Sequence, residues 1–163
     1  MRKESGFTLV ELILVVAVIA AVTTIGLVNY FGARNSQRLG LAADVLVREL
    51  SLTMERSRAQ EGSYQWWVHF DNPVGDGNDL YVVCYGTYTA SGANCAAEGG
   101  TESKRTSLGA GLEFTDPASG VSKDVVFNKA TGLPTGTATV IINSTAGAGS
   151  KTITINTNGS ITF

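Results

Sequence analysis

Residue types that do chemistry are scarce in this chain. Histidine occurs once, as His69, and cysteine twice, as Cys84 and Cys95. Two cysteines and one histidine do not complete the four-ligand set of a zinc site built from these residue types. His69 also lacks a motif that would supply a nucleophile and an orienting partner for base catalysis. We therefore expect no catalytic site and no cofactor, and we interpret His69 as a strand residue.

Charge is nearly absent from residues 7–31. Between residues 7 and 31 the only charged side chain is Glu11. A run of about 20 apolar residues is long enough to cross the hydrocarbon core of a bilayer as a helix. We therefore predict a transmembrane helix over residues 7–33. An unpaired carboxylate in lipid is costly, so Glu11 predicts a functional role with a partner that neutralises it.

The same segment lacks the cleavage site of an ordinary secretory signal. Such a signal has a basic start, an apolar stretch of about 7–15 residues and then a small-residue cleavage site. Arg2 and Lys3 provide the basic start here, but the apolar run is longer and no A-x-A-like site follows it. The small residue is Gly6, which precedes the apolar run.

This arrangement resembles the N-terminus of the type IV pilin-like family, which carries a class III signal, also called the prepilin N-methylation motif. The matching residues are Lys3, Gly6, Phe7, Thr8, Leu9 and Glu11. The resemblance implies that a prepilin peptidase removes the leader, residues 1–6, by cutting between Gly6 and Phe7, and that it methylates Phe7. It also implies that Glu11 pairs with the N-terminal ammonium of a neighbouring subunit and sets the register of assembly. An ordinary signal anchor is the alternative, and it would leave Glu11 without a partner.

The stretch after the apolar run predicts that the helix continues as an amphipathic half, over residues 34–61. Apolar residues recur at steps of three and four, at Leu39, Ala43, Leu46, Leu50 and Met54. Charged residues fall mostly on the other faces, which is typical of a helix that packs on a domain. Gly62 follows at a place where glycine commonly ends a helix.

Residues 62–163 predict an antiparallel β head domain. Short apolar or alternating stretches are separated by Gly, Pro, Asn and Asp turns, a pattern that favours strands. The predicted strands are 64–70, 80–85, 112–115, 125–128, 138–143, 152–156 and 161–163. Those after residue 108 are expected to form a meander that closes with an Asn-Gly hairpin turn. The predicted fold is α+β and pilin-like, a long N-terminal helix packed on a C-terminal antiparallel sheet.

The two cysteines lie close together in the sequence of the head. Cys84 and Cys95 indicate one disulfide in a translocated domain, with two free thiols as the alternative. Cys95 lies within a loop predicted over residues 86–106. Loops of this length are usually functional or mobile, so this loop is the candidate place for contact if the head has a partner on its exposed side. The sequence leaves open whether it is a recognition surface.

A polar turn over residues 71–79 contains three carboxylates and two asparagines. Oxygen ligands of this kind can hold Ca²⁺, and Asp71, Asp76 and Asp79 are therefore weak calcium candidates. The spacing is not that of an EF-hand, because the bidentate glutamate is missing. A solvated β-turn explains the composition equally well, so we predict no metal centre here.

A second resemblance covers roughly the last forty residues. The string Val126-Phe127-Asn128-Lys129-Ala130-Thr131-Gly132, with strand 152–156 and Asn158-Gly159 after it, is similar to the C-terminal part of GspH/FimT-type minor pilins or pseudopilins. Some members of that group bind DNA through a basic segment near the final glycine, where this chain has Ser160-Ile161-Thr162-Phe163. The formal net charge of −2 also gives no general affinity for nucleic acid, so DNA binding is not favoured. Many major pilins have proline at the position of Val28, and its absence argues against a major pilin but not against a minor one.

These resemblances predict a non-catalytic structural subunit, a minor pilin of a type IV pilus. The implied partners are the prepilin peptidase, other pilin or pseudopilin subunits, the inner-membrane assembly platform and, before assembly, the lipid bilayer. The implied location is the bacterial inner membrane, crossed once with the head in the periplasm, and then the pilus or pseudopilus. An H-type minor pseudopilin of a type II secretion system has the same signal and fold and stays open. A membrane-anchored enzyme is a remote alternative, because the chain lacks a catalytic set.

Overall fold

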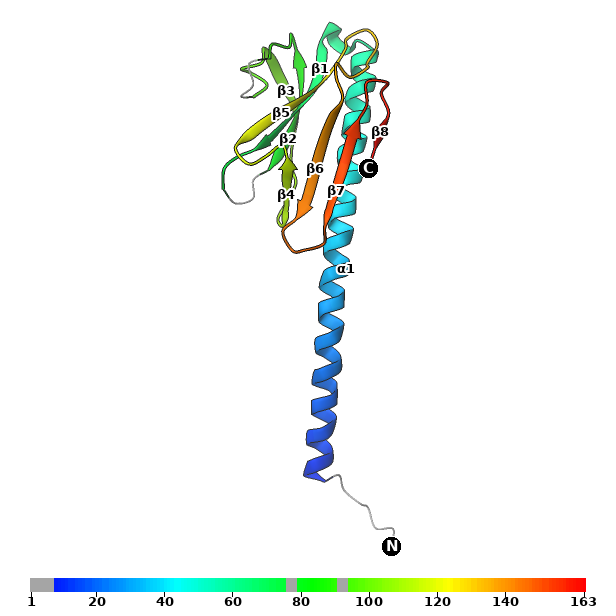
Figure 1. Ribbon diagram of the computed structural model, residues 1–163, viewed down its shortest axis with the longest axis vertical. Helices are drawn as coiled ribbons and strands as arrows, with labels where there is room; N and C mark the ends of the chain where they lie inside the picture. The colour runs from blue at the N-terminus through cyan, green and yellow to red at the C-terminus, as the bar shows by residue number, and fades with distance from the viewer. Residues whose placement is uncertain (1–7, 76–78, 91–93) are drawn as a thin grey trace.

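The fold is one long helix that carries a head of two β-sheets (Figure 1). A computed structural model describes residues 8–75, 79–90 and 94–163, except for the side chains of residues 25–29. Helix α1 spans Leu9–Arg58. Its C-terminal half lies along the head, and its N-terminal half extends beyond the head (Figure 1). The predicted α+β, pilin-like architecture is confirmed.

Within the described part of the head there are eight strands, and a short 3-10 turn, η1 (Glu61–Ser63), leads into them. The strands are β1 (Gln65–Asn72), β2 (Leu80–Gly86), β3 (Gly100–Ser107), β4 (Leu112–Asp116), β5 (Val121–Phe127), β6 (Ala138–Ser144), β7 (Ser150–Ile155) and β8 (Ile161–Thr162). One sheet has the order β3-β2-β1-β5 and the other the order β4-β6-β7-β8, with antiparallel pairing throughout.

The apolar stripe predicted on the second half of α1 faces the main core. Leu39, Ala43, Leu46 and Leu50 are buried, and Met54 is half-buried against the same cluster. Alternate residues of the strands supply the other side of this core, among them Phe70 and Ile153. Each fully buried side chain of this size stabilises the fold by about 1.5–3 kcal/mol. The stripe therefore fixes which face of α1 the head covers.

The helix ends at Arg58, three residues before the predicted boundary at 61. The stop is made by Gln60, which takes a left-handed conformation with φ 54°, and not by Gly62, which lies in η1. Contacts with the head hold this last turn. The Ser57 hydroxyl donates to the backbone carbonyls of Phe127 and Asn128, at 3.2 and 3.1 Å.

Part of the predicted loop over 86–106 is a strand, which corrects that prediction. Strand β3 pairs with β2 from Gly86↔Gly100 to Leu80↔Ser107. Its residues are mostly polar and exposed, and β3 is an edge strand of its sheet. An edge strand without a buried face shows no apolar alternation, and periodicity therefore does not reveal it.

The predicted meander after residue 108 is also wrong in one respect, because β5 leaves it. Strand β5 pairs with β1 in the other sheet, whereas β6, β7 and β8 follow one another as predicted. The side chain of Asn72 holds the corner between β4 and β5 by donating to the carbonyls of Phe114 and Pro117, both at 2.8 Å. Gly120 N–H in turn donates to the carbonyl of Asn72. These bonds direct the chain from one sheet to the other.

Asp116 joins the two sheets at this corner. Its carboxylate accepts hydrogen bonds from the Lys123 ammonium on β5 and from the Thr139 hydroxyl on β6. Burial alone would raise the pKa of Asp116, but these hydrogen bonds and the charge of Lys123 outweigh burial and lower it. The folded head therefore favours the ionised form of this carboxyl group.

Candidate functional site

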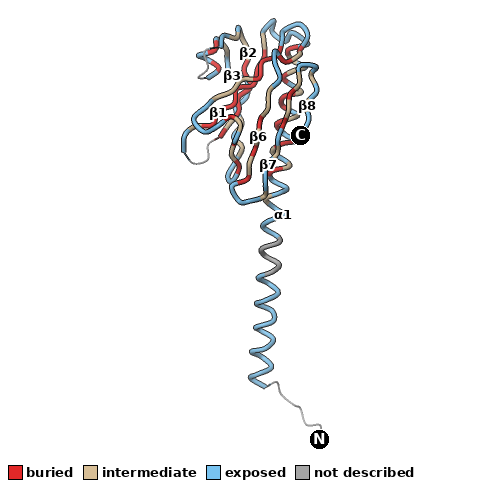
Figure 2. The backbone as a smooth tube through the Cα atoms, in the orientation of Figure 1, coloured by how far each residue is buried: buried red, intermediate tan, exposed pale blue. Residues whose placement is uncertain are grey.

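The N-terminal half of α1 is apolar and exposed on all sides. Figure 2 shows residues 9–24 of the helix in the colour of exposed residues, away from the head. Its large apolar side chains are between 46% and 72% exposed: Leu9, Val10, Leu12, Ile13, Leu14, Val15, Val16, Val18, Ile19 and Val22. A helix that is apolar all round needs lipid or other protein around it, because water does not solvate such a surface.

No helix among the described residues meets both requirements of a membrane span, sufficient length and sufficient apolarity. The transmembrane segment predicted over residues 7–33 stays a prediction.

Glu11 caps the first turn of this helix. Its carboxylate accepts hydrogen bonds from the backbone N–H of Thr8 at 2.9 Å and from the Thr8 hydroxyl at 2.8 Å. The Thr8 hydroxyl accepts the backbone N–H of Glu11 in return, which completes a capping box. The positive end of the helix dipole also favours the carboxylate at this place. The predicted cleavage and methylation residues, Gly6 and Phe7, lie outside the described residues.

The string shared with the second resemblance forms a turn against the C-terminal end of α1. Gly132 N–H donates to the carbonyl of Asn128, and Asn128 N–H donates to the carbonyl of Leu133, both at 2.8 Å. Gly132 has φ 67°, and a Cβ there would lie 2.6 Å from the backbone oxygen of Met54. The Arg58 guanidinium donates to the carbonyl of Thr131. This turn thus fastens the head to the helix, and its closeness requires glycine.

A second, smaller core lies on the outer face of the sheet that contains β1. The predicted disulfide between Cys84 and Cys95 is present, with their Cα atoms 5.7 Å apart, and it joins β2 to the segment 94–99. This core consists of Trp67, Val82, Cys84, Cys95 and Val126. Trp67 points to the face opposite its neighbours in the main core, because side chains alternate along a strand. The segment 94–99 therefore belongs to a packed layer, and Glu98 within it is fully buried.

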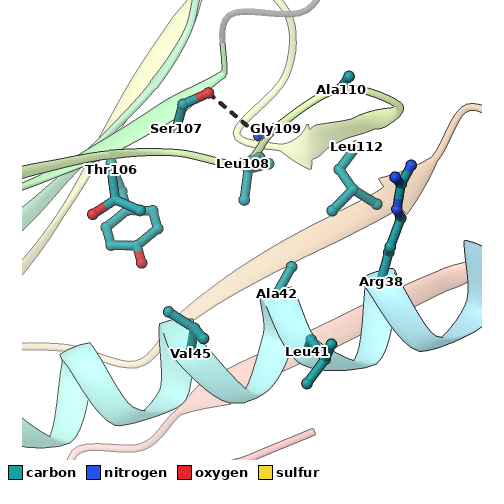
Figure 3. A pocket seen from close by; sticks show the side chains of 11 residues that line it. Arg38, Leu41, Ala42, Val45, Thr106, Ser107, Leu108, Gly109, Ala110 and Leu112 are labelled. Carbon is teal, nitrogen blue, oxygen red and sulfur yellow. Dashed lines mark hydrogen bonds between the residues drawn. The ribbon is translucent and has the colours of Figure 1, made fainter.

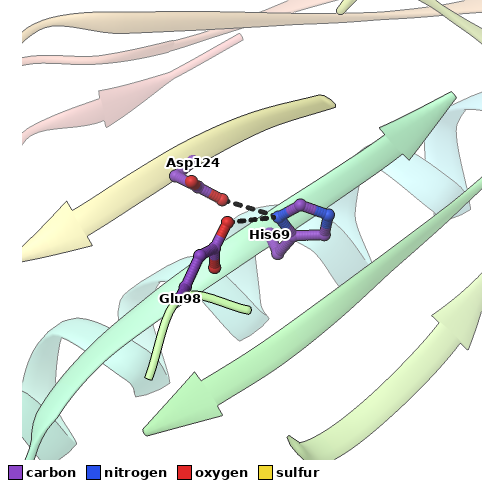
Figure 4. A group of neighbouring side chains, drawn as sticks. All are labelled: His69, Glu98 and Asp124. Carbon is purple, nitrogen blue, oxygen red and sulfur yellow. Dashed lines mark hydrogen bonds and ion pairs between the residues drawn. The ribbon is translucent and has the colours of Figure 1, made fainter. Parts of the chain in front are cut away.

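Three ionisable side chains meet beside this outer core. His69 of β1 and Asp124 of β5 are cross-strand neighbours, and Glu98 reaches them from the segment 94–99 (Figure 4). His69 Nδ1 lies 2.7 Å from Asp124 Oδ1 and 3.2 Å from Glu98 Oε1. His69 and Glu98 are buried, and Asp124 is 13% exposed. These three ligand atoms all lie within 4.8 Å of one another, the one such group among the residues that the structure describes.

Each carboxylate of this cluster has one oxygen held by a neighbouring aromatic residue. The Trp67 indole N–H donates to Glu98 Oε2 at 2.6 Å, and the Tyr88 hydroxyl donates to Asp124 Oδ2 at 3.1 Å. The remaining oxygen of each, Glu98 Oε1 and Asp124 Oδ1, points toward His69 Nδ1 (Figure 4). Glu98 Oε1 is buried and accepts no hydrogen bond.

The two acids respond to this shared site in opposite directions. Burial, together with the hydrogen bond and negative charge of Asp124, raises the pKa of Glu98 to about 7. Burial would also raise the pKa of Asp124, but hydrogen bonds from His69 and Glu98 outweigh it and lower that pKa. Burial would lower the pKa of His69, but the hydrogen bond and charge of Asp124 outweigh burial, and the net effect is a raised pKa. The surroundings thus favour the protonated forms of Glu98 and His69 and the ionised form of Asp124.

A groove lies between α1 and the β3–β4 corner (Figure 3). It has a volume of about 440 Å³ and a mostly apolar lining that includes Leu41, Val45, Leu108 and Leu112, with Arg38 at one end. Arg38 is the one basic side chain among the described residues of its lining, and the phenol of Tyr81 also faces it. The groove offers apolar surface and one positive charge but no constellation for catalysis.

The weak calcium candidates do not form one group among the described residues. Asp79 is buried, and its carboxylate accepts the backbone N–H of Phe114. Asp71 lies on β1, where it pairs with Leu80 of β2. Asp76 lies outside the described residues, so a calcium site over 71–79 stays a prediction.

Comparisons with known proteins concern the N-terminal motif and the fold. A family model described as the prokaryotic N-terminal methylation motif matches residues 1–27. The fold is similar to that of the minor pseudopilin EpsH from the type 2 secretion system of Vibrio cholerae, with a TM-score of 0.50 and 16% identity. That match covers 77% of this chain and 94% of the pseudopilin chain. The chain carries a prokaryotic N-terminal methylation motif on a pilin-like fold. No curated protein sequence matches it.

Sequence reasoning about this pilin-like chain placed His69 correctly on a strand but missed its partners. Glu98 and Asp124 are 29 and 55 residues away in sequence, and only the register of β5 on β1 and the tethered segment bring them together. The available signal was the predicted disulfide. A bridge from Cys84 to Cys95 holds the segment that contains Glu98 against the sheet.

Proposed function

We propose that the chain is a non-catalytic structural subunit, a minor pilin, that assembles into a filament through the N-terminal half of α1. The observation that carries this proposal is the exposed apolar surface of that half-helix, joined to the methylation motif. Removing a large apolar side chain from water is worth about 1.5–3 kcal/mol, so ten such residues give a strong drive toward association. Before assembly the bilayer of the inner membrane covers this surface, and in the filament the helices of neighbouring subunits replace it.

In this proposal the prepilin peptidase cuts after Gly6 and methylates Phe7. The new N-terminal ammonium of one subunit then pairs with Glu11 of its neighbour, which sets the axial register of the helices. In the single subunit the Glu11 carboxylate is held by Thr8 instead. Assembly therefore exchanges an internal cap for an intersubunit ion pair. The inner-membrane assembly platform inserts the subunit, with its head on the periplasmic side.

A second candidate is a minor pseudopilin of a type II secretion system. The similarity of the fold to the pseudopilin EpsH favours this candidate. The two candidates predict different losses when the gene is deleted. A minor pilin is needed for surface pili, whereas a minor pseudopilin is needed for the release of folded proteins into the medium.

The assembly role is tested by replacing Glu11 with glutamine in cells that make the filament. Glu11→Gln keeps the shape and a hydrogen-bond acceptor but removes the charge, so we expect normal processing and at least a tenfold loss from the filament fraction. Thr8→Ala is the matched variant, because it weakens the internal cap by about 1 kcal/mol and leaves the intersubunit pair intact. Filament incorporation of Glu11→Gln at the wild-type level would contradict the proposed register.

A further inference from the structure

The cluster of His69, Glu98 and Asp124 contains more acidic groups than basic ones. Its two carboxylates face one imidazole, and the pKa shifts of all three groups are caused by burial, by one another and by Trp67, Tyr88 or Asp71. No lysine or arginine takes part in the cluster among residues 8–75, 79–90 and 94–163. Lys123, the neighbour of Asp124 in sequence, is paired with Asp116. Among the described residues His69 is thus the one basic partner of two largely buried acids, and a metal ion at this place would neutralise both carboxylates.

The candidate ligand atoms of the cluster point at one another. Trp67 and Tyr88 hold Glu98 Oε2 and Asp124 Oδ2, and this leaves Glu98 Oε1, Asp124 Oδ1 and His69 Nδ1 directed inward. Glu98 is 0% exposed, and its Oε1 has no hydrogen-bond donor, so this atom is an unused ligand inside the protein. Outer hydrogen bonds that orient the inner ligands are typical of metal sites.

We propose that His69, Glu98 and Asp124 bind a divalent transition-metal ion, for which Zn²⁺ is the best match. A nitrogen with two carboxylate oxygens suits zinc, whereas calcium takes six to eight oxygen ligands. At metal–ligand distances of about 2.1 Å, tetrahedral ligands stand about 3.4 Å apart. The observed separations of 2.7 and 3.2 Å from His69 Nδ1 reach that value with side-chain shifts of less than about 1 Å. Binding of the ion would displace protons from its ligands and neutralise the two carboxylates.

Such an ion would join three separate parts of the head. His69 belongs to β1, Asp124 to β5, and Glu98 to the segment that the disulfide ties to β2. The metal would thus fasten the outer layer over the sheet, independently of the filament role proposed above. The reaction involves no redox change: the ion displaces one or more protons, which are released to solvent.

The test uses the full-length protein in detergent, stripped with a chelator and dialysed. After this treatment, wild type should bind about one added Zn²⁺ per chain, as measured by titration calorimetry and elemental analysis. Its unfolding temperature should be higher with Zn²⁺ than with the chelator. Co²⁺ should give the visible absorption bands of a tetrahedral site. Glu98→Gln keeps an acceptor for Trp67 and should lower the Zn²⁺ affinity at least 100-fold. Glu102→Gln, an exposed acid on β3, is the matched control and should bind as wild type does.

Several results would overturn the proposal. These are the absence of zinc binding to wild type, equal binding by Glu98→Gln, or binding of Ca²⁺ in place of Zn²⁺. If Glu98→Gln does not fold, Asp124→Asn removes a charge from the same site and gives the same comparison. The Co²⁺ spectrum of wild type needs no variant, and a spectrum typical of octahedral coordination by water would also refute the site.

Discussion

Replacing Gly132 with alanine tests how the head is fastened to the helix. Gly132 has φ 67°, a conformation that costs an L-residue about 1–2 kcal/mol. The new Cβ would also lie 2.6 Å from the backbone oxygen of Met54 and 2.8 Å from the Cβ of Arg58. Both neighbours belong to the last turns of α1, which cannot move aside like a flexible side chain. Overpacking of this kind costs about 1–3 kcal/mol.

Two further glycines separate these contributions. Gly147 has φ 78°, and a Cβ there would have no other atom within 4 Å, so Gly147→Ala should show the conformational cost alone, about 1–2 kcal/mol. Gly136 has open space and no left-handed conformation, so Gly136→Ala should be neutral or up to about 1 kcal/mol more stable. Gly132→Ala should therefore lower the free energy of unfolding by about 2–5 kcal/mol, the sum of backbone strain and overpacking.

Urea unfolding of the full-length protein in detergent, followed by tryptophan fluorescence, gives the three free energies of unfolding. The expected order of destabilisation is Gly132→Ala, then Gly147→Ala, then Gly136→Ala, with unchanged slopes against urea. A Gly132→Ala loss no larger than that of Gly147→Ala would refute the close packing of this turn on α1.

Three other changes test the core, the outer layer and the corner between the sheets. Leu46→Ala should lower the free energy of unfolding by about 2–5 kcal/mol, because Leu46 is fully buried. Leu41 is 64% exposed, so Leu41→Ala should change this free energy by no more than about 0.5 kcal/mol. Equal losses in urea unfolding would contradict the face of α1 that is assigned to the core. Replacing both Cys84 and Cys95 with serine should cost about 3 kcal/mol, since the bond joins residues 11 apart, and reductant should then have no further effect on the unfolding midpoint. Asp116→Asn should be less stable than wild type near neutral pH, because the folded pKa of Asp116 is lowered and its contribution is present above the ordinary pKa. That difference should shrink as the pH falls below about 4 and the carboxyl group is protonated in both states, and a constant difference from pH 7 to pH 3 would exclude the lowered pKa.

Local periodicity was enough to predict much of this fold. The stripe from Leu39 to Leu50 repeats at helical spacing, and the structure buries all of it. Strands with one or two buried faces, such as β1 and β6, are also recognisable by their apolar content. Strand β3 was hidden because its exposed edge has no apolar face. The crossing of β5 depends on hydrogen bonds of Asn72 with a distant corner, which no local pattern records.

The functional sites likewise differ in how far the sequence alone predicts them. The methylation motif is a continuous string that ends at Glu11, so it was visible in the sequence and the family model matches it. The disulfide followed from two cysteines at short spacing. The cluster around His69 is different, because its acids come from a tethered loop and from a strand of unknown register. Only the folded sheet shows that these groups share one buried space.

The most direct measurement of the central claim is the intact mass and N-terminal sequence of the protein recovered from the cell envelope. Wild type should begin at a methylated Phe7, and Gly6→Ala should keep residues 1–6. Fragment masses would place the methyl group on Phe7. A wild-type protein that retains Met1 to Gly6, or that is cut after the apolar run, would contradict processing as a pilin-like subunit.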